Sequence, residues 1–239
     1  MPQALLRALG LHDSIIALVW LGGPVCGAVL QPYFGLRSEH CRSPWGRRRP
    51  YIACGAAAVI LSLLGLASVD AYANAGARTS MLCQAAAILG MTALNASIQP
   101  LQGGLRALLV DASPPHQLAA ANAWASRLTS VANVLGYLAG FLDLSGGSRG
   151  SSQFRVLCAL CAAAIVATAS LTCAAVSEIP SAEPAAAKGD AGATMRQVWS
   201  QLGYTYARFS RLPVMARRVC YVQFCAWLAW APYLFYIAL

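Results

Sequence analysis

The stretch NASIQPLQGGLRALLVD, residues 95–111, decides how the rest of the chain is interpreted. It closes a long apolar run that begins at Met81, and its polar side chains are Asn95, Gln99, Gln102 and Arg106. Their spacings of four, three and four residues place them on one face of an α-helix. The rest of this helix is Ala, Leu, Ile and Met, which suits lipid or neighbouring helices.

Two arrangements explain this polar face. A central Arg in a membrane helix costs about 2.5–3.5 kcal/mol on insertion scales, so such groups face water or protein rather than lipid. The face therefore either lines a wet cavity, which serves passage or binding, or forms a hydrogen-bonded seam with another helix. We favour the cavity and keep the seam as the alternative.

The composition indicates an integral membrane protein. Of 239 residues, 58% are hydrophobic and 10% are charged, and the mean hydropathy is +0.57. Globular domains carry about 25% charged residues, and several apolar runs here approach the roughly 20 residues that span a bilayer. The net charge of +9 comes mainly from loops, with no basic motif interleaved with aromatics, so we predict no nucleic-acid partner.

Nothing in the sequence points to an enzyme, a metal or a cofactor. The predicted spans hold no cluster of acids, His or Cys and no Ser/Lys pair, so we assign no catalytic residue. Cys158 and Cys161 form a CxxC pair without a second pair or a nearby His. We therefore interpret them as structural thiols rather than a zinc or redox site.

Six spans follow from the apolar runs, so the predicted fold is an all-α helical bundle in a membrane. The spans cover residues 14–34, 51–69, 81–110, 117–142, 154–176 and 219–239. Pro24 and Pro32 should bend or end the first span, and Pro100 should kink the third. Gly23 and Gly27 should permit a close helix contact.

Three parts are expected along the chain. They are a bundle of five spans (residues 1–176), a cytoplasmic linker (177–218) with a disordered first part and an interfacial helix over 195–218, and a final span (219–239). The loop 35–50 has five Arg and the linker has six Lys or Arg, against four in the other loops and the start of the chain. This imbalance places loop 35–50 and the linker in the cytoplasm.

The fourth span carries a second polar stripe. Its members recur every three or four residues and are Asn122, Ser126, Thr129, Asn133, Gly136 and Gly140. Arg127 lies off this stripe but within the span. The two glycines also fit a packing notch.

Three stretches resemble sucrose and α-glucoside proton symporters of the major facilitator superfamily, in the glycoside–pentoside–hexuronide branch. They are LVWLGGPVCGAVLQPYFG running into SEHCRSPWGRRRPYI, then LQGGLRALLVDASPPHQLAAANAWASRL with NVLGY, and finally VQFCAWLAWAPYLFY. The fungal-type members look closest. Such proteins have twelve spans, and the six here resemble the second to the seventh, so a helix before the start and most of the second half are expected to be missing.

The resemblance implies secondary transport of a disaccharide, by proton symport in full-length members, with a sugar and a proton as partners. It implies sugar contacts at Asn95, Gln99, Gln102, Arg106, Asn122, Arg127 and Trp227, because hydroxyls need donors and acceptors and an aromatic ring can stack on a pyranose. It implies a gating loop at Gly35, Glu39, Gly46, Arg47, Arg48 and Arg49. We expect the plasma membrane rather than the vacuolar membrane.

One position departs from the family pattern. Asn95 stands where the family usually has Asp, and Gln99 where it usually has Asn. A buried carboxylate is a natural proton carrier, whereas an amide cannot titrate, and no Asp, Glu or His lies within the predicted spans. We therefore predict that proton coupling is lost or altered. The alternative function is a non-transporting fragment or degenerate paralogue that acts only by binding a partner membrane protein.

Overall fold

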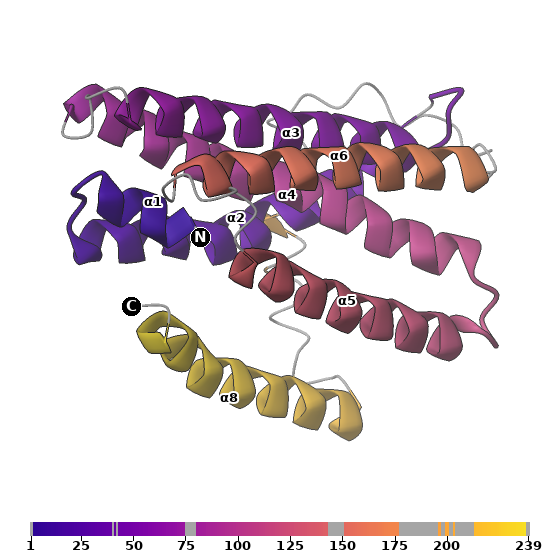
Figure 1. Cartoon of the computed structure of the whole chain (residues 1–239). Coiled ribbons are helices and arrows are strands. Elements are labelled where there is room, and N and C mark those ends of the chain that lie inside the picture. Colours follow the sequence, from indigo (N-terminus) through magenta and orange to yellow (C-terminus); the bar gives the residue numbers. More distant parts are fainter. Residues whose placement is uncertain are drawn as a thin grey trace. The chain divides into compact units, whose positions relative to one another are not determined.

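In a computed structural model of the chain, every regular element among the described residues is a helix (Figure 1). The structure describes residues 2–39, 41, 43–74, 80–142, 151–176, 196, 199, 200, 203 and 213–237. The helices are α1 (Pro2–Ala8), α2 (Asp13–Glu39), α3 (Arg49–Tyr72), α4 (Met81–Ala112), α5 (Leu118–Phe141), α6 (Ser151–Ala175) and α8 (Val214–Ile237). The predicted all-α fold is confirmed.

The chain divides into two compact units. The first, Met1–Ala185, holds α1 to α6, and the second, Ala186–Leu239, holds α8. α8 begins at Val214, so residues 214–218, which the sequence analysis assigned to the linker, are helical. The predicted disordered segment and most of the predicted interfacial helix over 195–218 lie outside the described residues.

Four helices in the described part of the chain are long and apolar enough to cross a membrane. They cover Asp13–Ser38, Arg49–Tyr72, Met81–Ala112 and Gln153–Ala175. α5 and α8 have 24 residues each but are not among the four. In α5 the polar side chains of the predicted stripe and Arg127 reduce the mean hydropathy of a helix that is otherwise of spanning length.

The prolines do not end α2. The helix continues through Pro24 and Pro32 to Glu39, so the end predicted near residue 34 is wrong. Prolines are tolerated inside membrane helices because neighbouring groups satisfy the backbone carbonyls that they free. α4 likewise continues through Pro100, and Pro50 lies in the first turn of α3, where a proline is tolerated.

Glycines let α3 and α4 pack at backbone distance. A Cβ on Gly55 of α3 would lie 2.8 Å from the backbone nitrogen of Leu101 in α4. A Cβ on Gly104 of α4 would lie 2.8 Å from Cγ1 of Ile52 in α3. α6 packs on α3 as well, and α2 packs on α4, so α3 and α4 form the centre of the first unit (Figure 1).

The best-buried cluster lies where α1 meets the longer helices. Leu6, Leu9, Ile16 and Leu66 are each at most 2% exposed. Gln84 of α4 donates its amide hydrogen to the carbonyl oxygen of Leu9 at 2.9 Å, which satisfies a group at the end of α1. The short helix α1 is thus fixed to the bundle by apolar burial, by this bond and by the ion pair of Arg7 with Asp13 at the start of α2.

We expect Gly55→Ala to destabilise the first unit by about 1–3 kcal/mol, because the new methyl group meets the α4 backbone, which cannot rotate away. The matched control is Gly65→Ala in the same helix, where a Cβ meets nothing within 4 Å. Thermal unfolding of the two variants in detergent measures the difference. Equal melting temperatures would contradict the close α3–α4 contact.

Candidate functional site

The polar face of α4 divides between two environments. Its first two members, Asn95 and Gln99, lie near the middle of the helix and point toward α2, where glycines leave room for them. A Cβ on Gly23 would lie 3.5 Å from Oδ1 of Asn95, and a Cβ on Gly27 would lie 3.5 Å from Oε1 of Gln99. Gly23 and Gly27 thus face α4 as predicted, but they meet amide side chains at ordinary contact distance rather than the α4 backbone.

Gln99 is held in a hydrogen-bonded seam between α2 and α4. Its side chain is buried, and its oxygen accepts a bond from Nε2 of Gln31 at 2.8 Å. Its own Nε2 donates to the carbonyl oxygen of Asn95 at 2.9 Å. At this residue the structure has the seam that the sequence analysis kept as its alternative, because Gln31 supplies a partner that the α4 pattern alone did not reveal.

Gln102 and Arg106 are in a different situation. Both are exposed, and neither makes a hydrogen bond or ion pair with a described residue. Counted from the middle of the 32-residue helix α4, Arg106 lies about 14 Å toward its C-terminal end, at 1.5 Å per residue. Half of a hydrocarbon core is about 15 Å thick, so Arg106 sits near the edge of the apolar layer.

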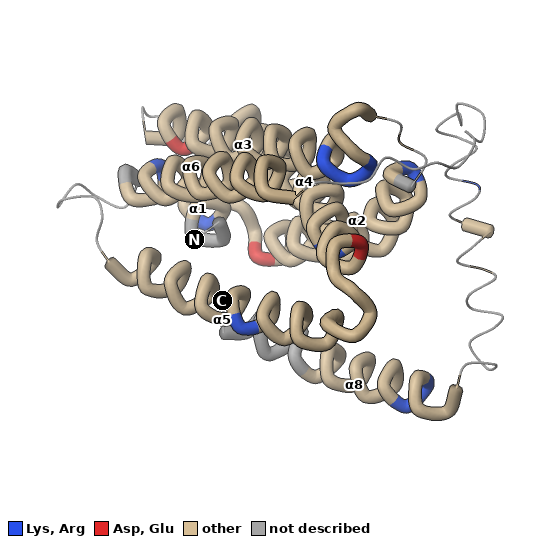
Figure 2. Tube along the Cα trace, turned by 90° about the vertical axis from the view of Figure 1, so that its right-hand side faces the viewer, with Lys and Arg blue, Asp and Glu red and all other residues tan. Residues whose placement is uncertain are grey.

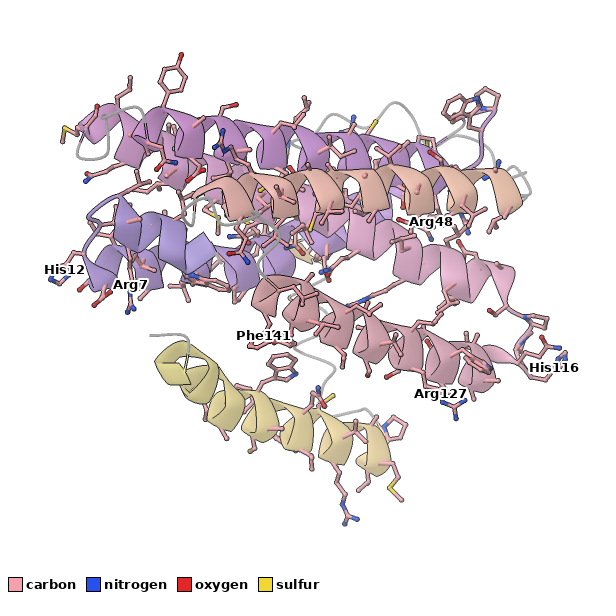
Figure 3. The ribbon with its side chains drawn as sticks, viewed as in Figure 1. Arg7, His12, Arg48, His116, Arg127 and Phe141 are labelled. Carbon is pink, nitrogen blue, oxygen red and sulfur yellow. The ribbon has the colours of Figure 1, made fainter. Side chains whose placement is uncertain are left out.

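Residues of α5 do not converge with α4 in a single pocket. α5 has no buried residue in the described part of the chain, and Asn122 is exposed. The Arg127 guanidinium lies 5.1 Å from the ring centre of Trp124, and it points away from α4 in Figure 3. Such a cation–π contact is worth about 0.5–1 kcal/mol at an exposed site. Trp227 is exposed on α8, in the second unit.

The loop between α2 and α3 forms a tight turn around Gly46. Gly46 has φ +110°, which side-chain-bearing residues rarely adopt, and its N–H bonds to the carbonyl oxygen of Ser43 at 3.0 Å. This turn directs the chain so that the next residues, Arg47 and Arg48, reach two helix ends. Glycine at this position of the motif therefore has a conformational reason.

Arg48 connects α2 to α4, and we call this set of bonds the latch. Its guanidinium donates to the carbonyl oxygen of Gly35 at 3.2 Å, to the hydroxyl of Ser38, and to Oδ2 of Asp111 at 3.1 Å. Arg47 donates to the same carboxylate oxygen at 2.7 Å. The Arg48 side chain is only 7% exposed, so the latch is buried on one side.

The latch complements the charges at the helix ends. The C-terminal end of a helix carries a partial negative charge, so the Arg48 cation is favourable beside Gly35 near the end of α2. Asp111 stands at the unfavourable end of α4, where two guanidinium groups compensate it. Figure 2 shows these basic residues gathered at the α2–α3 connection. Of the remaining predicted loop residues, Arg49 begins α3, and the Glu39 side chain lies outside the described ones.

A second ion pair lies at the other end of α3. Arg155 of α6 approaches Oδ2 of Asp70 with its Nε at 3.6 Å, and the Asp70 side chain is 7% exposed. α3 extends to Tyr72, three residues past the predicted end of the second span. Asp70 therefore lies inside this helix. The prediction that no acidic residue lies within a span is wrong at this position. Asp70 stands four residues after the buried Leu66, a spacing that places it on the inner face and could have revealed it.

The chain is similar to sugar transporters along most of its length. The family described as "MFS/sugar transport protein" matches residues 5–209. The general alpha-glucoside permease of Schizosaccharomyces pombe is 31% identical over 97% of this chain and 42% of the permease. Sucrose transport protein SUT3 of Oryza sativa subsp. japonica is 30% identical over 96% of this chain and 48% of that protein. The chain thus spans a little under half the length of these relatives.

We expect Arg48→Gln to cost about 3–5 kcal/mol of stability, because it leaves three acceptors at two helix ends without their buried cation. The matched control is Arg47→Gln, which removes one partly exposed contact to the same carboxylate and should cost about 1 kcal/mol or less. Thermal unfolding in detergent measures both variants. A smaller loss for Arg48→Gln than for Arg47→Gln would contradict the assignment of Arg48 as the centre of the latch.

Proposed function

The chain belongs to the MFS/sugar transport family, and we propose that it serves secondary transport of a disaccharide, sucrose or another α-glucoside, across a membrane. The family match over residues 5–209 carries this proposal. It is supported by relatives named as an alpha-glucoside permease and a sucrose transport protein. These relatives are transporters rather than enzymes, and apolar helices of spanning length make this an integral membrane protein.

The exposed polar groups of α4 suit a sugar. An amide offers two donors and an acceptor, and a guanidinium offers five donors, so Gln102 and Arg106 together can satisfy several hydroxyl groups. Both side chains are exposed and uncommitted among the described residues, although they lie on a helix of membrane-spanning length. We assign these two residues the main sugar contacts of this unit.

The remaining predicted contacts have different environments. Gln99 bonds α4 to Gln31 of α2, and Asn95 lies beside Gly23, so a sugar contact at Gln99 requires exchange of its bond to Gln31. Asn122, Arg127 and Trp227 are exposed and available for contact. They remain predicted sugar contacts.

We assign the loop between α2 and α3 a gating role through the latch. The bonds to Gly35, Ser38 and Asp111 join elements of the first unit, so the latch keeps α2 and α4 in one arrangement as the unit moves. Transporters of this kind alternate access by rocking one bundle against the other, which requires each bundle to be stiff.

We also propose that the protein lies in the plasma membrane rather than the vacuolar membrane.

A second candidate function is binding of a partner membrane protein without transport. α5 favours it, because large apolar side chains are exposed along that helix, including Tyr137 at 79% and Phe141 at 86%. Exposed apolar groups on a membrane helix suit lipid as well as another helix. Uptake measurements separate the two functions.

We expect saturable uptake of radiolabelled sucrose or maltose in transport-deficient yeast that expresses the chain. Arg106→Gln should reduce uptake at least tenfold, and Gln102→Ala at least threefold, because each removes donors that hold hydroxyl groups. Arg7→Gln is the matched charge control, since Arg7 pairs with the exposed Asp13 at the other end of the unit and lies outside the proposed sugar contacts. Membrane abundance is measured by immunoblot for each variant.

Two results contradict this proposal. Uptake equal to that of cells without the protein, at normal abundance and with a partner recovered by co-purification, supports the second function. If neither Arg106→Gln nor Gln102→Ala changes uptake, the polar face of α4 does not contact the sugar.

We propose that proton coupling is lost or altered because Asn95 cannot titrate. Asn95→Asp should then create or increase sucrose-driven alkalinisation of the medium, measured with a pH electrode on the same cells. The control is Asp70→Asn, which removes the buried acid that the structure reveals in α3. Strong sucrose-driven alkalinisation by the unmodified protein contradicts the proposal, and its loss in Asp70→Asn would move the proton site to that residue.

A further inference from the structure

An apolar pocket of about 490 Å³ lies between α2, α3 and α4. α2 lines it with Leu30 and Phe34, α3 with Tyr51, Cys54 and Ala58, and α4 adds Ala96, Ser97 and Pro100. Its volume falls within the range of about 300–1,000 Å³ that is common for ligand pockets. The small side chains of Ala58 and Ala96 create the space where three helices come together.

The lining excludes a sugar as the occupant. Its two hydroxyl groups already donate within the protein, since Ser97 Oγ donates to the carbonyl oxygen of Ala93 at 2.6 Å and Tyr51 Oη to that of Arg37 at 3.3 Å. Their oxygens can still accept, but two acceptors serve only a few of the hydroxyl groups of a sugar, so a sugar buried here would leave most of its hydroxyl groups without partners, which costs free energy. An apolar chain loses nothing in the same place, so the pocket suits hydrocarbon.

Aromatic rings place one end of the pocket at the membrane surface. Tyr33 and Phe34 pack edge to face with ring centres 5.2 Å apart, and Phe34 and Tyr51 with centres 6.2 Å apart. Tyr is enriched at the level of the lipid headgroups. The same end of the unit holds the basic α2–α3 connection, which the topology prediction places at the cytoplasmic face.

Arg37 offers a charge at this end. Leu30, Phe34 and Arg37 follow each other at spacings of four and three residues on one face of α2, and Arg37 lies about 10 Å beyond Leu30 along the helix. The Arg37 guanidinium is exposed; it donates to the hydroxyl of Tyr33 at 2.9 Å and also interacts with the hydroxyl of Tyr51. Its other donors are available to a phosphate, which guanidinium groups bind well.

We propose that this pocket holds one acyl chain of an anionic phospholipid from the bilayer, with the lipid phosphate on Arg37. Two features argue for a negative headgroup: the excess of Arg at this end of the protein, and the enrichment of anionic lipids in the leaflet that it faces. Residues 35–50, at the end of α2, the connection and the start of α3, hold five Arg and one acidic residue, and of these Arg, Arg47 and Arg48 pair with Asp111. Anionic lipids collect in the cytoplasmic leaflet, and basic pockets between membrane helices on that side bind their headgroups.

The test uses the full chain in phosphatidylcholine vesicles that contain phosphatidylserine with a diazirine on its acyl chain. After photolysis, mass spectrometry should find the label on peptides with Phe34 and Cys54, at least threefold above the label from a phosphatidylcholine carrying the same diazirine. Ala58→Phe should reduce labelling of these peptides at least fivefold, because its ring fills the pocket.

Arg37→Gln tests the headgroup contact and leaves the pocket intact. It should reduce the preference for phosphatidylserine to about parity, whereas Arg7→Gln, with the same change in charge at the other end of the unit, should keep the threefold preference. Equal labelling by the two lipids in the unmodified protein would overturn the proposal. The proposal would also be overturned if neither Ala58→Phe nor Arg37→Gln changed the labelling. Thermal unfolding checks that each variant folds.

Discussion

The structure depends on one constraint, that polar groups on a membrane helix must find partners or water because hydrocarbon offers neither. α4 meets it in two ways. Toward α2, Gln99 bonds to Gln31 and to the carbonyl oxygen of Asn95, in space that Gly23 and Gly27 leave free. Farther along, Gln102 and Arg106 have no such partner among the described residues and are exposed. The same polar face therefore joins α4 to α2 at Gln99, and nearer the C-terminal end of α4 it offers the exposed polar groups of Gln102 and Arg106.

The first unit is tied together at both ends by charge and along its middle by close backbone packing. Arg48 links Gly35 and Ser38 of α2 to Asp111 of α4 at one end, and Asp70 of α3 faces Arg155 of α6 at the other. Between them, Gly55 and Gly104 bring the α3 and α4 backbones together. Breaking a buried pair leaves a charge without compensation, so these contacts favour one arrangement of the helices. A stiff bundle of this kind is what a rocking transporter requires.

Polar and apolar recognition occupy different faces of α4. Gln102 and Arg106 offer donors and acceptors for a hydroxyl-rich molecule, whereas Ala96 and Pro100 line a pocket whose hydroxyl groups already donate within the protein. A sugar and an acyl chain therefore have no common site in this unit. The proposed lipid binding beside Arg37 and the proposed sugar transport along α4 are therefore separable, although both involve the end of the unit that holds the latch.

Sequence reasoning alone established the membrane class, the sugar-transport family and the six long helices, because apolar run length and the motifs around residues 46–50 and 106–111 are local properties, but it did not predict the short helix α1. It also predicted the contact at Gly23 and Gly27, since small residues four apart fit a close helix pair. It did not determine that α2 passes its two prolines, that Asp70 lies inside α3, or which polar groups of α4 are satisfied. Those features depend on residues distant in the chain, such as Gln31 and Arg155, and only the packed structure decided which of them come within bonding distance.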